Sequence, residues 1–531
     1  MITTTNSIRL TGTEGNFTKV ETEITNGIGI HLVGLADAAV KESLLRTITA
    51  LQAKGYHIPG RKIVINLAPA DLLKSGSRYD LPIALSIIAA SGQDNGALKD
   101  IDKWLIVGEL GLDGSVREVA GCVQAIGGAI LSGCKGVIIP KCNGVEIVDL
   151  LPEKTIPVYG VESLNEAVSV LSGDETVPTI WGDPANAQTE NNTPEEPAWN
   201  RISGNESARR AIEIAAAGGH HILLMGATET DRSLLARALR DILPPMTREE
   251  AIDTARIWSA AGKGPLRAAG TEGVFTRPYR APHYSTSLAA LLGGGPGENI
   301  RPGEVSLASG GILHLDGFAE MPKSLKESLR GPLEDKKVTI SRLKTKVEIP
   351  ARFQLVAGTN SCPCGHYGEG DRCTCTENQR LTYLQRLSGP VFDNIDIQIF
   401  VHRSATPEWV KVTPPEGEDA ASVRKRVAKA REAQRGRLGE GRFNADMKAS
   451  DIYRFCELGE EEKDLMEKLI DRLGLSARSY TRILKVARTI ADLDGRESIR
   501  TSDLAEAASY RFLDRRNFGE KECHKKDKKT A

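Results

Sequence analysis

Strand and helix patterns alternate along residues 1–175. The β-branched runs KIVINL (62–67) and GVIIP (136–140) are typical of buried strands. From Asp37 to Lys54, Ala, Leu and Ile recur at roughly helical spacing, which predicts a helix. Glycines punctuate the stretches between these segments, as expected of turns. Residues 1–175 are therefore predicted to form an α+β domain.

A second α/β pattern occupies residues 201–403. A helical pattern over Glu206–Ala217 is followed by the apolar strand HILLMG (221–226), a short loop and a helix that starts near Ser233. Two more apolar runs predict strands, namely ILHLD (312–316) and FQLVAG (353–358). The intervening segment 176–200 is rich in Pro, Asn, Thr and Glu and is predicted to be a linker, with an ordered surface loop as the alternative.

The C-terminal part of the chain is predicted to be mostly helical, over residues 404–516. Ser422–Leu438 is highly charged, whereas Asp464–Leu493 and Ser502–Phe512 have helical periodicity. The stretch 517–531 is predicted to be a basic, disordered tail because of its lysines, which are Lys521, Lys525, Lys526, Lys528 and Lys529.

Length and composition indicate how many domains the chain has and which classes of protein can be excluded. At roughly 100–200 residues per domain, 531 residues suggest three or four domains. Lys and Arg number 69 against 70 Asp and Glu, so any contact with nucleic acid must come from a local patch. No apolar run reaches the ~18 residues that cross a bilayer, and the first residues lack the apolar core of a signal peptide. We therefore expect a cytoplasmic protein with no membrane segment.

The loop between the strand HILLMG and the next helix lies where a phosphate-binding loop would lie. The pattern of such loops is G-x-x-x-x-G-K-[ST]. Here the residues are Gly226, Ala227, Thr228, Glu229, Thr230, Asp231, Arg232 and Ser233. Gly226 and Ser233 match, but Asp231 replaces the second Gly and Arg232 replaces the Lys. As a bare pattern the match fails, and a strand–turn–helix without a ligand is the alternative.

These two replacements change both backbone and charge. The second Gly allows the positive φ that brings N–H groups close to phosphate, and Asp tolerates that conformation better than most residues. The carboxylates of Asp231 and Glu229 would repel a polyphosphate, however, and the planar fork of Arg232 differs in shape from an ammonium group. We therefore expect ATP affinity to be weakened or lost.

Two polar residues that follow strands belong to the same hypothesis. Asp316 ends ILHLD, where phosphate-loop ATPases place the acid that helps to hold Mg²⁺. Asn360 follows FQLVAG and fits a polar residue that orients water or the γ-phosphate, with an ordinary turn Asn as the alternative. Glu320 lies four positions beyond Asp316, and its role stays open.

Four of the nine cysteines form a C-x-C–x₈–C-x-C cluster, made by Cys362, Cys364, Cys373 and Cys375. Four thiolates on a short loop suit a tetrahedral Zn²⁺ site, which would pin the loop after Asn360 and leave no open position for chemistry. His366 could replace one ligand. Free thiols or redox pairing are the alternatives, and disulfides are disfavoured in a reducing cytosol.

The order of these motifs resembles the magnesium-chelatase-like AAA+ family of the YifB and ComM type, over almost the whole chain. The resemblance is carried by several segments in the family's order, among them AIEIAAAGGHHILLMG (211–226), RPGEVSLASGGILHLD (301–316), FQLVAGTNSCPCGHYG (353–368), RLSGPVFDNID (386–396) and GLSARSYTRILKVARTIADL (474–493). It implies a Lon-protease-like domain of ribosomal-S5 type over 1–175, a central AAA+ αβα domain over 201–403 and a helical domain over 404–516.

Against the family pattern, the nucleotide site departs at three places. The family's loop reads close to GPPGTGKS, the acid after Asp316 is Gly317 here, and the candidate arginine finger is Asn394. Arg478 matches the family's sensor-2 arginine. Removing an arginine finger costs about 10³–10⁵ in rate in related GTPases. The resemblance therefore implies a degenerate member, with the ATPase fold retained and use of ATP and Mg²⁺ in doubt.

The Lon-like region also lacks the catalytic Ser and Lys of Lon proteases. GSRYDLPIALSI (76–87) lies where Lon proteases carry the catalytic Ser, but Asp80 occupies that neighbourhood. AGCVQAIGGA (120–129) matches the region of the catalytic Lys and contains none. Since a Ser–Lys dyad needs both groups, the domain is predicted to be proteolytically inactive.

By resemblance, the protein would bind single-stranded or branched DNA and act in recombination or branch migration, as a homo-hexamer or a mixed ring. Three basic stretches could face DNA: Arg277–Arg280, Lys336–Lys346 and Arg424–Arg442. A solvated surface is the alternative for each. The alternative function is a non-hydrolysing scaffold or regulatory partner of an active relative.

Overall fold

A computed structural model describes residues 2–514, apart from 99, 149, 152–154, 175, 183–195, 203, 229, 265–275, 296–298, 343–345, 369–371, 388–390 and 403–417. Glu229 and the basic tail 517–531 lie outside the described residues, as does most of the predicted linker. Each described end of that linker contains a buried residue, because Ile180 and Trp199 lie in two different cores. None of the helices in the described part has the length and apolar character needed to span a membrane.

The N-terminal lobe is built on a seven-stranded mixed sheet with strand order β3-β4-β2-β1-β5-β8-β9. The strands are β1 (Ile2–Thr11), β2 (Glu14–Thr25), β3 (Ile30–Val33), β4 (Lys62–Ala68), β5 (Trp104–Ile106), β8 (Gly136–Pro140) and β9 (Val158–Val161). The two strands predicted from the sequence are confirmed as β4 and β8. Burial alternates along β4 but is complete along β8, so β4 has one face against the core and β8 has two.

Helices cover the faces of this sheet: α1 (Ala38–Ala53), α2 (Asp80–Ser91), α3 (Cys122–Leu131) and α4 (Leu164–Ser172). The predicted helix is confirmed as α1, which Asp37 caps by accepting a hydrogen bond from the N–H of Val40 (2.9 Å). In α2, every residue from Asp80 to Ile88 is buried, and its apolar side chains form the centre of the largest N-terminal core cluster.

The second lobe has a five-stranded parallel sheet with strand order β11-β14-β17-β10-β18. Its strands are β10 (Ile222–Gly226), β11 (Tyr279–Arg280), β14 (Ile312–Leu315), β17 (Gln354–Asn360) and β18 (Ile397–Val401). Along β10, Ile222 and Leu224 pack into one core and Leu223 and Met225 into another, so this central strand is buried on both faces. All these strands end at the same edge, where Gly226 pairs in register with Asn360.

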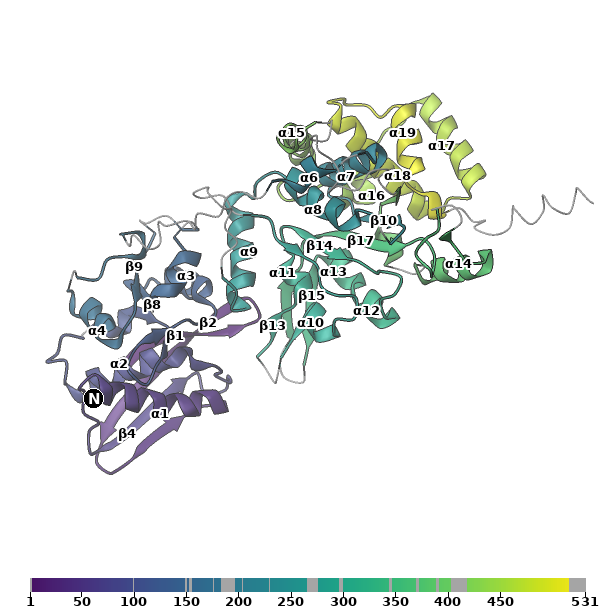
Figure 1. The fold of residues 1–531 in the computed structure, drawn as a ribbon. Helices are drawn as coiled ribbons and strands as arrows, with labels where there is room; N and C mark the ends of the chain where they lie inside the picture. The colour runs from purple at the N-terminus through teal and green to yellow at the C-terminus, as the bar shows by residue number, and fades with distance from the viewer. Residues whose placement is uncertain are drawn as a thin grey trace, which may run out of the picture.

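Helices surround this sheet and continue into the C-terminal region (Figure 1). Helices of this lobe include α7 (Glu206–Gly218), α8 (Arg232–Ile242), α9 (Arg248–Ala260) and α14 (Glu377–Leu384). The C-terminal helices are α15 (Ala420–Leu438), α16 (Ala449–Phe455), α17 (Glu460–Leu473), α18 (Ala477–Leu493) and α19 (Thr501–Ser509). They share one core with α7 and α8, which confirms a helical C-terminal region packed onto the parallel sheet.

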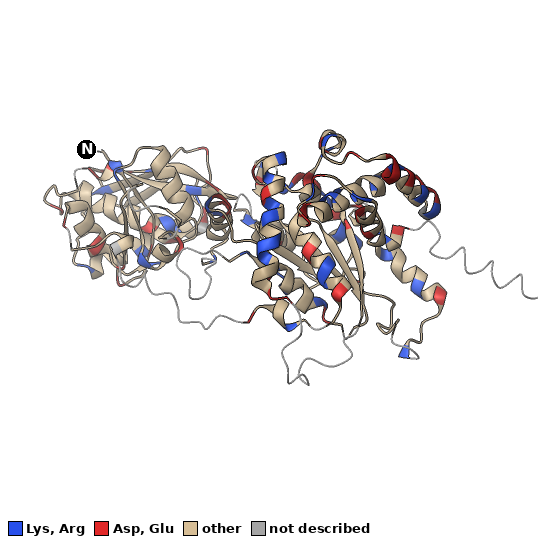
Figure 2. Cartoon of the chain, turned by 90° about the horizontal axis from the view of Figure 1, so that it is seen from above, with Lys and Arg blue, Asp and Glu red and all other residues tan. Residues whose placement is uncertain are grey.

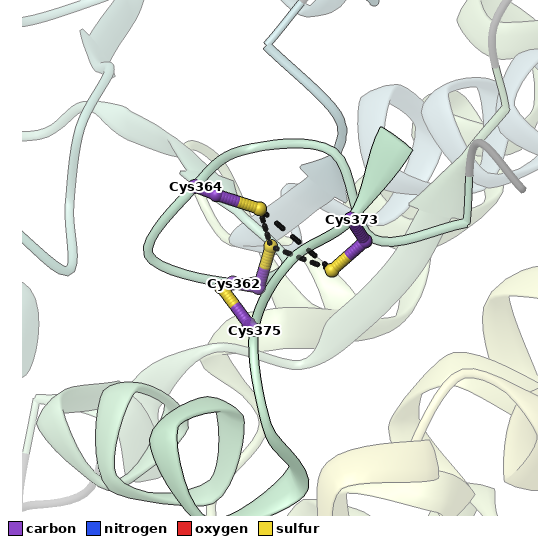
Figure 3. Close-up of side chains that lie close together, drawn as sticks. All are labelled: Cys362, Cys364, Cys373 and Cys375. Atoms are coloured by element: carbon purple, nitrogen blue, oxygen red, sulfur yellow. Dashed lines mark hydrogen bonds between the residues drawn. The ribbon is translucent and has the colours of Figure 1, made fainter. Parts of the chain in front are cut away.

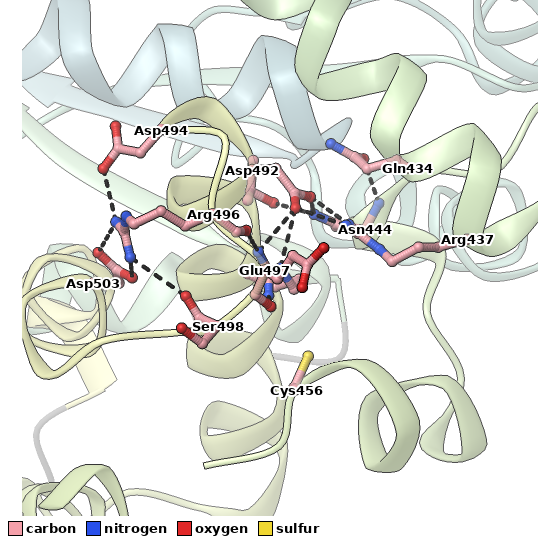
Figure 4. Close-up of polar contacts among 12 residues, drawn as sticks. Gln434, Arg437, Asn444, Cys456, Asp492, Asp494, Arg496, Glu497, Ser498 and Asp503 are labelled. Carbon is pink, nitrogen blue, oxygen red and sulfur yellow. Dashed lines mark hydrogen bonds and ion pairs between the residues drawn. The ribbon is translucent and has the colours of Figure 1, made fainter. Parts of the chain in front are cut away.

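A buried polar network stabilises the C-terminal helices (Figure 4). The carboxylate of Asp492 accepts hydrogen bonds from Arg437 (2.8 Å), Arg488 (3.1 Å) and Asn444 (2.8 Å). Each of these groups would be costly to bury alone, and the network satisfies them together. This network fixes α15 against α18.

Helix α9 joins the two lobes, and Figure 1 shows it standing between them. The N–H of Gly121 donates to the carbonyl of Ser259 (3.0 Å), and Gln124 Nε2 donates to the carbonyl of Arg256 (2.6 Å). Ala251 is buried in the core cluster of the N-terminal lobe. Two β-hairpins lie beside this joint, β12 (Gly293–Gly294) with β13 (Arg301–Pro302) and β15 (Lys337–Ser341) with β16 (Lys346–Pro350).

Candidate nucleotide and metal sites

The loop between β10 and α8 is closed by its own hydrogen bonds. The N–H of Thr230 donates to the carbonyl of Ala227 (3.2 Å), and the N–H of Arg232 donates to the carbonyl of Thr230 (2.8 Å). The N–H of Thr228 donates to the carbonyl of Gly365, in the cysteine loop (2.9 Å). A phosphate-binding loop needs such N–H groups to point at the ligand. In the described part of this loop, the N–H groups of Thr228, Thr230 and Arg232 point instead at carbonyl oxygens of the protein.

The backbone of Asp231 explains part of this closure. We expected Asp231 to be able to take the left-handed conformation of the missing Gly, but its φ is −74° and its ψ is 36°. Within the described part of this loop, no residue from 226 to 231 has a positive φ. The loop therefore turns without the backbone geometry that lets a phosphate loop wrap an anion.

Arg232 is buried at the base of this loop, with 6% of its surface exposed. Its Nη1 donates to the carbonyl oxygens of Gly226 (3.0 Å) and Thr359 (2.6 Å), and to Oδ1 of Asn360 (3.0 Å). Its Nη2 lies 3.6 Å from Oδ1 of Asp316. The structure thus brings together three of the residues that we predicted for a nucleotide site, and the guanidinium group links them. Ser233, in contrast, is exposed in the first turn of α8.

The segment after Asp316 has an unusual backbone. Gly317 has a φ of +67°, which side chains other than Gly rarely adopt. A Cβ atom at Gly317 would lie 3.5 Å from Oε2 of Glu320, so the Glu320 carboxylate reaches back to the position where the family carries an acid. Glu320 accepts a hydrogen bond from the hydroxyl of Tyr383, on α14.

Tyr383 is a site residue that sequence reasoning missed. It is 3% exposed, and burial is the main cause that raises the pKa of its hydroxyl above the ordinary value, followed by the hydrogen bond to Glu320. The hydroxyl is therefore a stable hydrogen-bond donor at neutral pH. No motif surrounds Tyr383 in the sequence, and its distance in the chain from Asp316 hides the contact.

Arg478 and Asn394 lie in a different part of the lobe. Arg478 Nη1 donates to Oδ2 of Asp393 (2.7 Å), and both side chains are exposed. Asn394 Oδ1 accepts a hydrogen bond from Arg482 (3.2 Å). Arg478 lines a pocket of about 400 Å³ between α14 and α18, and the described residues around that pocket include none from 226–233. Within one chain, Arg478 therefore does not join the group around Arg232.

The four cysteine thiols lie close enough to bind one metal ion (Figure 3). All four sulfur atoms lie within 4.8 Å of one another. Cys362 Sγ is 3.3 Å from Cys364 Sγ and 3.8 Å from Cys373 Sγ. A tetrahedral Zn²⁺ with Zn–S bonds of about 2.3 Å needs sulfur atoms about 3.8 Å apart, so this donor set fits zinc. His366 is not part of the group, but its backbone N–H is the main cause that lowers the pKa of the Cys364 thiol to about 6.

Asp80 has a structural role in the N-terminal lobe. It is fully buried and accepts hydrogen bonds from Arg46 Nε (2.9 Å) and from the N–H of Leu110 (3.2 Å). Burial is the largest cause that raises the pKa of the Asp80 carboxyl, and the bonds to Arg46 and Ser43 oppose it. The nearby Ser77 donates to Glu109 rather than to a lysine.

Most arginines in two of the three predicted basic stretches are bound internally. Arg277 donates to three backbone carbonyls and to Glu250 (2.9 Å), and Arg280 forms two bonds with Glu304. On α15, the side chains with internal acceptors are Arg424, Arg426, Arg431 and Arg437. Figure 2 shows acidic residues mixed among the basic ones across the molecule. The β15–β16 hairpin is different: Lys337 and Lys346 lie at exposed positions of strands that also have buried positions, and among the described residues both pair with Glu348 (2.7 and 3.4 Å).

Comparison with known proteins identifies the family. Residues 198–409 match the family "Magnesium chelatase, subunit ChlI", residues 20–143 match "Subunit ChlI of Mg-chelatase" and residues 417–511 match "Magnesium chelatase, subunit ChlI C-terminal". The chain is 39% identical over 503 residues to protein YifB of Escherichia coli, covering 93% of this chain and 94% of that protein. It is 40% identical over 508 residues to competence protein ComM of Haemophilus influenzae, covering 94% and 96%. The chain therefore belongs to the magnesium-chelatase-like family of the YifB and ComM type.

A shorter similarity links the chain to a protease. An archaeal Lon protease of Methanocaldococcus jannaschii is 27% identical over 151 residues, which are 28% of this chain and 22% of that protein.

Proposed function

We propose that this protein is a DNA-associated member of its family in which the nucleotide site is held closed by Arg232, so that ATP binding and hydrolysis are weak or lost. The family uses nucleotide with Mg²⁺, and the positions involved are those of residues 226–233, Asp316 and Asn360. One observation carries the proposal: a single buried guanidinium group bonds to Gly226, Thr359 and Asn360 and lies beside Asp316.

Several costs oppose a triphosphate in this site. Arg232 would have to leave three acceptors that are buried or half-buried, and each hydrogen bond to a charged group contributes about 1.5–3 kcal/mol. The loop N–H groups would have to leave their carbonyl partners. Asp231 adds negative charge to the same loop.

Other regions of the molecule have proposed roles of their own. The cysteine cluster would hold a structural Zn²⁺ through its four thiolates. The N-terminal lobe would be a Lon-like domain without proteolytic activity, since Asp80 serves as a buried ion-pair partner of Arg46. The β15–β16 hairpin would contact DNA phosphates. The protein would assemble as a homo-hexamer or a mixed ring and act in the cytoplasm.

The test of the closed site is a titration with a fluorescent ATP analogue and Mg²⁺, using the wild type and Arg232→Lys. Lysine keeps the charge but cannot bond to several acceptors in one plane, so it would be free to reach a phosphate. We expect the substitution to raise nucleotide affinity at least tenfold, and the double variant with Asp231→Gly to raise it further. Arg435→Lys, an exposed position on α15, is the matched control and should change nothing.

Tight binding of the analogue by the wild type, or brisk phosphate release with or without branched DNA, would contradict the closed site. We leave Gly317 unchanged in this test. A Glu at a φ of +67° would add roughly 1–2 kcal/mol of backbone strain and confuse the result.

A non-hydrolysing scaffold or regulatory partner of an active relative is the second candidate. It is favoured by the three loop N–H groups that are bonded within the protein. Mixing the purified wild-type chain with an active family member should then change the relative's rate of phosphate release. The Arg232→Lys variant should have the same effect as the wild type.

A further inference from the structure

The cysteine loop is in direct contact with the phosphate-loop position. The N–H of Thr228 donates to the carbonyl oxygen of Gly365 (2.9 Å), and the hydroxyl of Thr228 donates to the same oxygen (3.3 Å). Gly365 follows Cys364 directly, and its own N–H donates to the carbonyl of Cys362 (3.1 Å). The acceptor for Thr228 therefore lies inside the tight turn that the first two cysteines form.

Only glycine fits at this contact. Gly365 has a φ of +82°, and a Cβ atom there would lie 2.0 Å from the hydroxyl oxygen of Thr228. Because no side chain separates the two segments, the two backbones pack against each other. Asn360, two residues before Cys362, is bonded to Arg232 (3.0 Å). The segment that begins at Asn360 thus touches the phosphate loop near both its tip and its base.

We propose that the cysteine loop is a metal-dependent clamp on the phosphate loop. With a metal ion on the four thiolates, Gly365 is a positioning residue that holds Thr228 and keeps the loop in its closed form. Without the metal, the turn around Gly365 loosens and releases the N–H of Thr228. This inference rests on the proposed metal site, and it adds that metal occupancy controls the backbone that a nucleotide would meet.

The cysteine loop is expected to depend on a bound metal ion for its ordered conformation. In the absence of metal, the side chains of the cluster are held by contacts between thiols, with Sγ–Sγ distances of 3.3–3.8 Å, and by backbone N–H groups such as that of His366. Thiol contacts are weak compared with metal–thiolate bonds, and metal binding supplies much of the free energy that orders small cysteine-rich segments. Gly365 also loses more conformational entropy on ordering than any other residue would. The turn is therefore expected to depend on the metal for its rigidity.

The test compares full-length protein loaded with Zn²⁺ and the same protein stripped by a chelator, by hydrogen–deuterium exchange with mass spectrometry. Peptides covering residues 226–233 should exchange at least tenfold faster after stripping, and added Zn²⁺ should restore their protection. Peptides from the buried core of α2 should not change. Stoichiometric zinc uptake with unchanged exchange in 226–233 would overturn the clamp while leaving the metal site intact.

A pair of variants separates the clamp from the metal itself. Gly365→Ala keeps all four cysteines, so it should bind zinc fully and still show fast exchange in 226–233. Gly368→Ala is the matched control: it lies in the same loop at a φ of +97° but faces Phe400, so it should keep the protection. Full protection in Gly365→Ala would overturn the clamp, and failure of the wild type to take up zinc would overturn both the clamp and the metal site. Tight ATP binding by the wild type would contradict only the closed nucleotide site.

Discussion

Arg232 carries the same positive charge as a lysine at this position would, but it binds groups of the protein itself. A lysine at this position would offer a single compact cation on a flexible stem, whereas arginine offers a planar fork. Here the fork reaches the ends of β10 and β17 at once, through the carbonyls of Gly226 and Thr359. Its Nε is buried and has no hydrogen-bond partner among the described residues, so there the guanidinium group is held through its Nη atoms. The resulting bonds tie the two strands together at the edge where a nucleotide would sit.

Asp80 allows a prediction at the same scale. Replacing it with Ala leaves Arg46 and the N–H of Leu110 without their acceptor inside the N-terminal lobe. Loss of a buried partner of this kind costs about 2–4 kcal/mol, so Asp80→Ala should lower the free energy of unfolding by that amount in urea titrations. Asp100→Ala, which removes an exposed partner of Lys103, is the control and should leave the midpoint unchanged. Equal midpoints for the two variants would refute a structural role for Asp80.

Among the secondary-structure elements, the joint between the lobes contains a buried carboxyl. Glu146 follows β8 in a short 3₁₀ segment (Lys141–Glu146), is 8% exposed and accepts a hydrogen bond from Asn143 (3.0 Å). It also hydrogen-bonds with Ser259 of α9. Burial, the largest cause, raises the pKa of Glu146 to about 7 from an ordinary 4.5. The folded protein therefore favours the neutral form of this side chain.

The sign of the pH effect follows from that shift. An acid whose pKa is raised in the folded state stabilises the fold fully below the unfolded pKa, and this stability is lost as pH rises through the folded pKa. Glu146→Gln should match the wild type near pH 4.5 and become more stable, by on the order of 3 kcal/mol, above pH 7. Glu162→Gln, at an exposed position, should show no such divergence in urea titrations at the two pH values. A constant difference at both pH values would exclude titration of Glu146 as the cause.

The elements also show how far sequence reasoning reaches. Periodicity and β-branched runs were sufficient for α1, β4 and β8, because local pattern and burial agree there. Parallel strands end at one edge of the sheet, so the sequence could predict that three residues would lie close together there: Arg232, Asp316 and Asn360. The direction of the Arg232 side chain could not, since it depends on acceptors more than 100 residues away in the chain. The contact of Tyr383 with Glu320 likewise has no local signal.

For the whole molecule, the distribution of charge limits where the proposed contact with DNA can lie. A segment rich in arginine looks basic in sequence, but Arg277 and most arginines of α15 are used to hold the fold together. An arginine that already donates to buried carbonyls is not free to neutralise a phosphate. Among the described residues of the β15–β16 hairpin, Lys337 and Lys346 pair with the same carboxylate, so this hairpin is the strongest remaining candidate for the proposed phosphate contact.

If this hairpin contacts DNA, removing the carboxylate of Glu348 and removing the charge of Lys346 should have opposite effects on DNA affinity. A hairpin that faces only solvent would show neither effect. Glu348→Gln removes the negative charge between Lys337 and Lys346 and should tighten binding to a single-stranded oligonucleotide several-fold, whereas Lys346→Gln should weaken it and reduce the slope of log affinity against log salt by about 1. Since we propose that the nucleotide site is closed, both effects should be the same with and without ATP. Arg280→Gln, which breaks an internal pair with Glu304, should leave the salt slope unchanged. If Arg280→Gln lowered the slope while the hairpin variants did not, the DNA surface would have to lie elsewhere on the molecule.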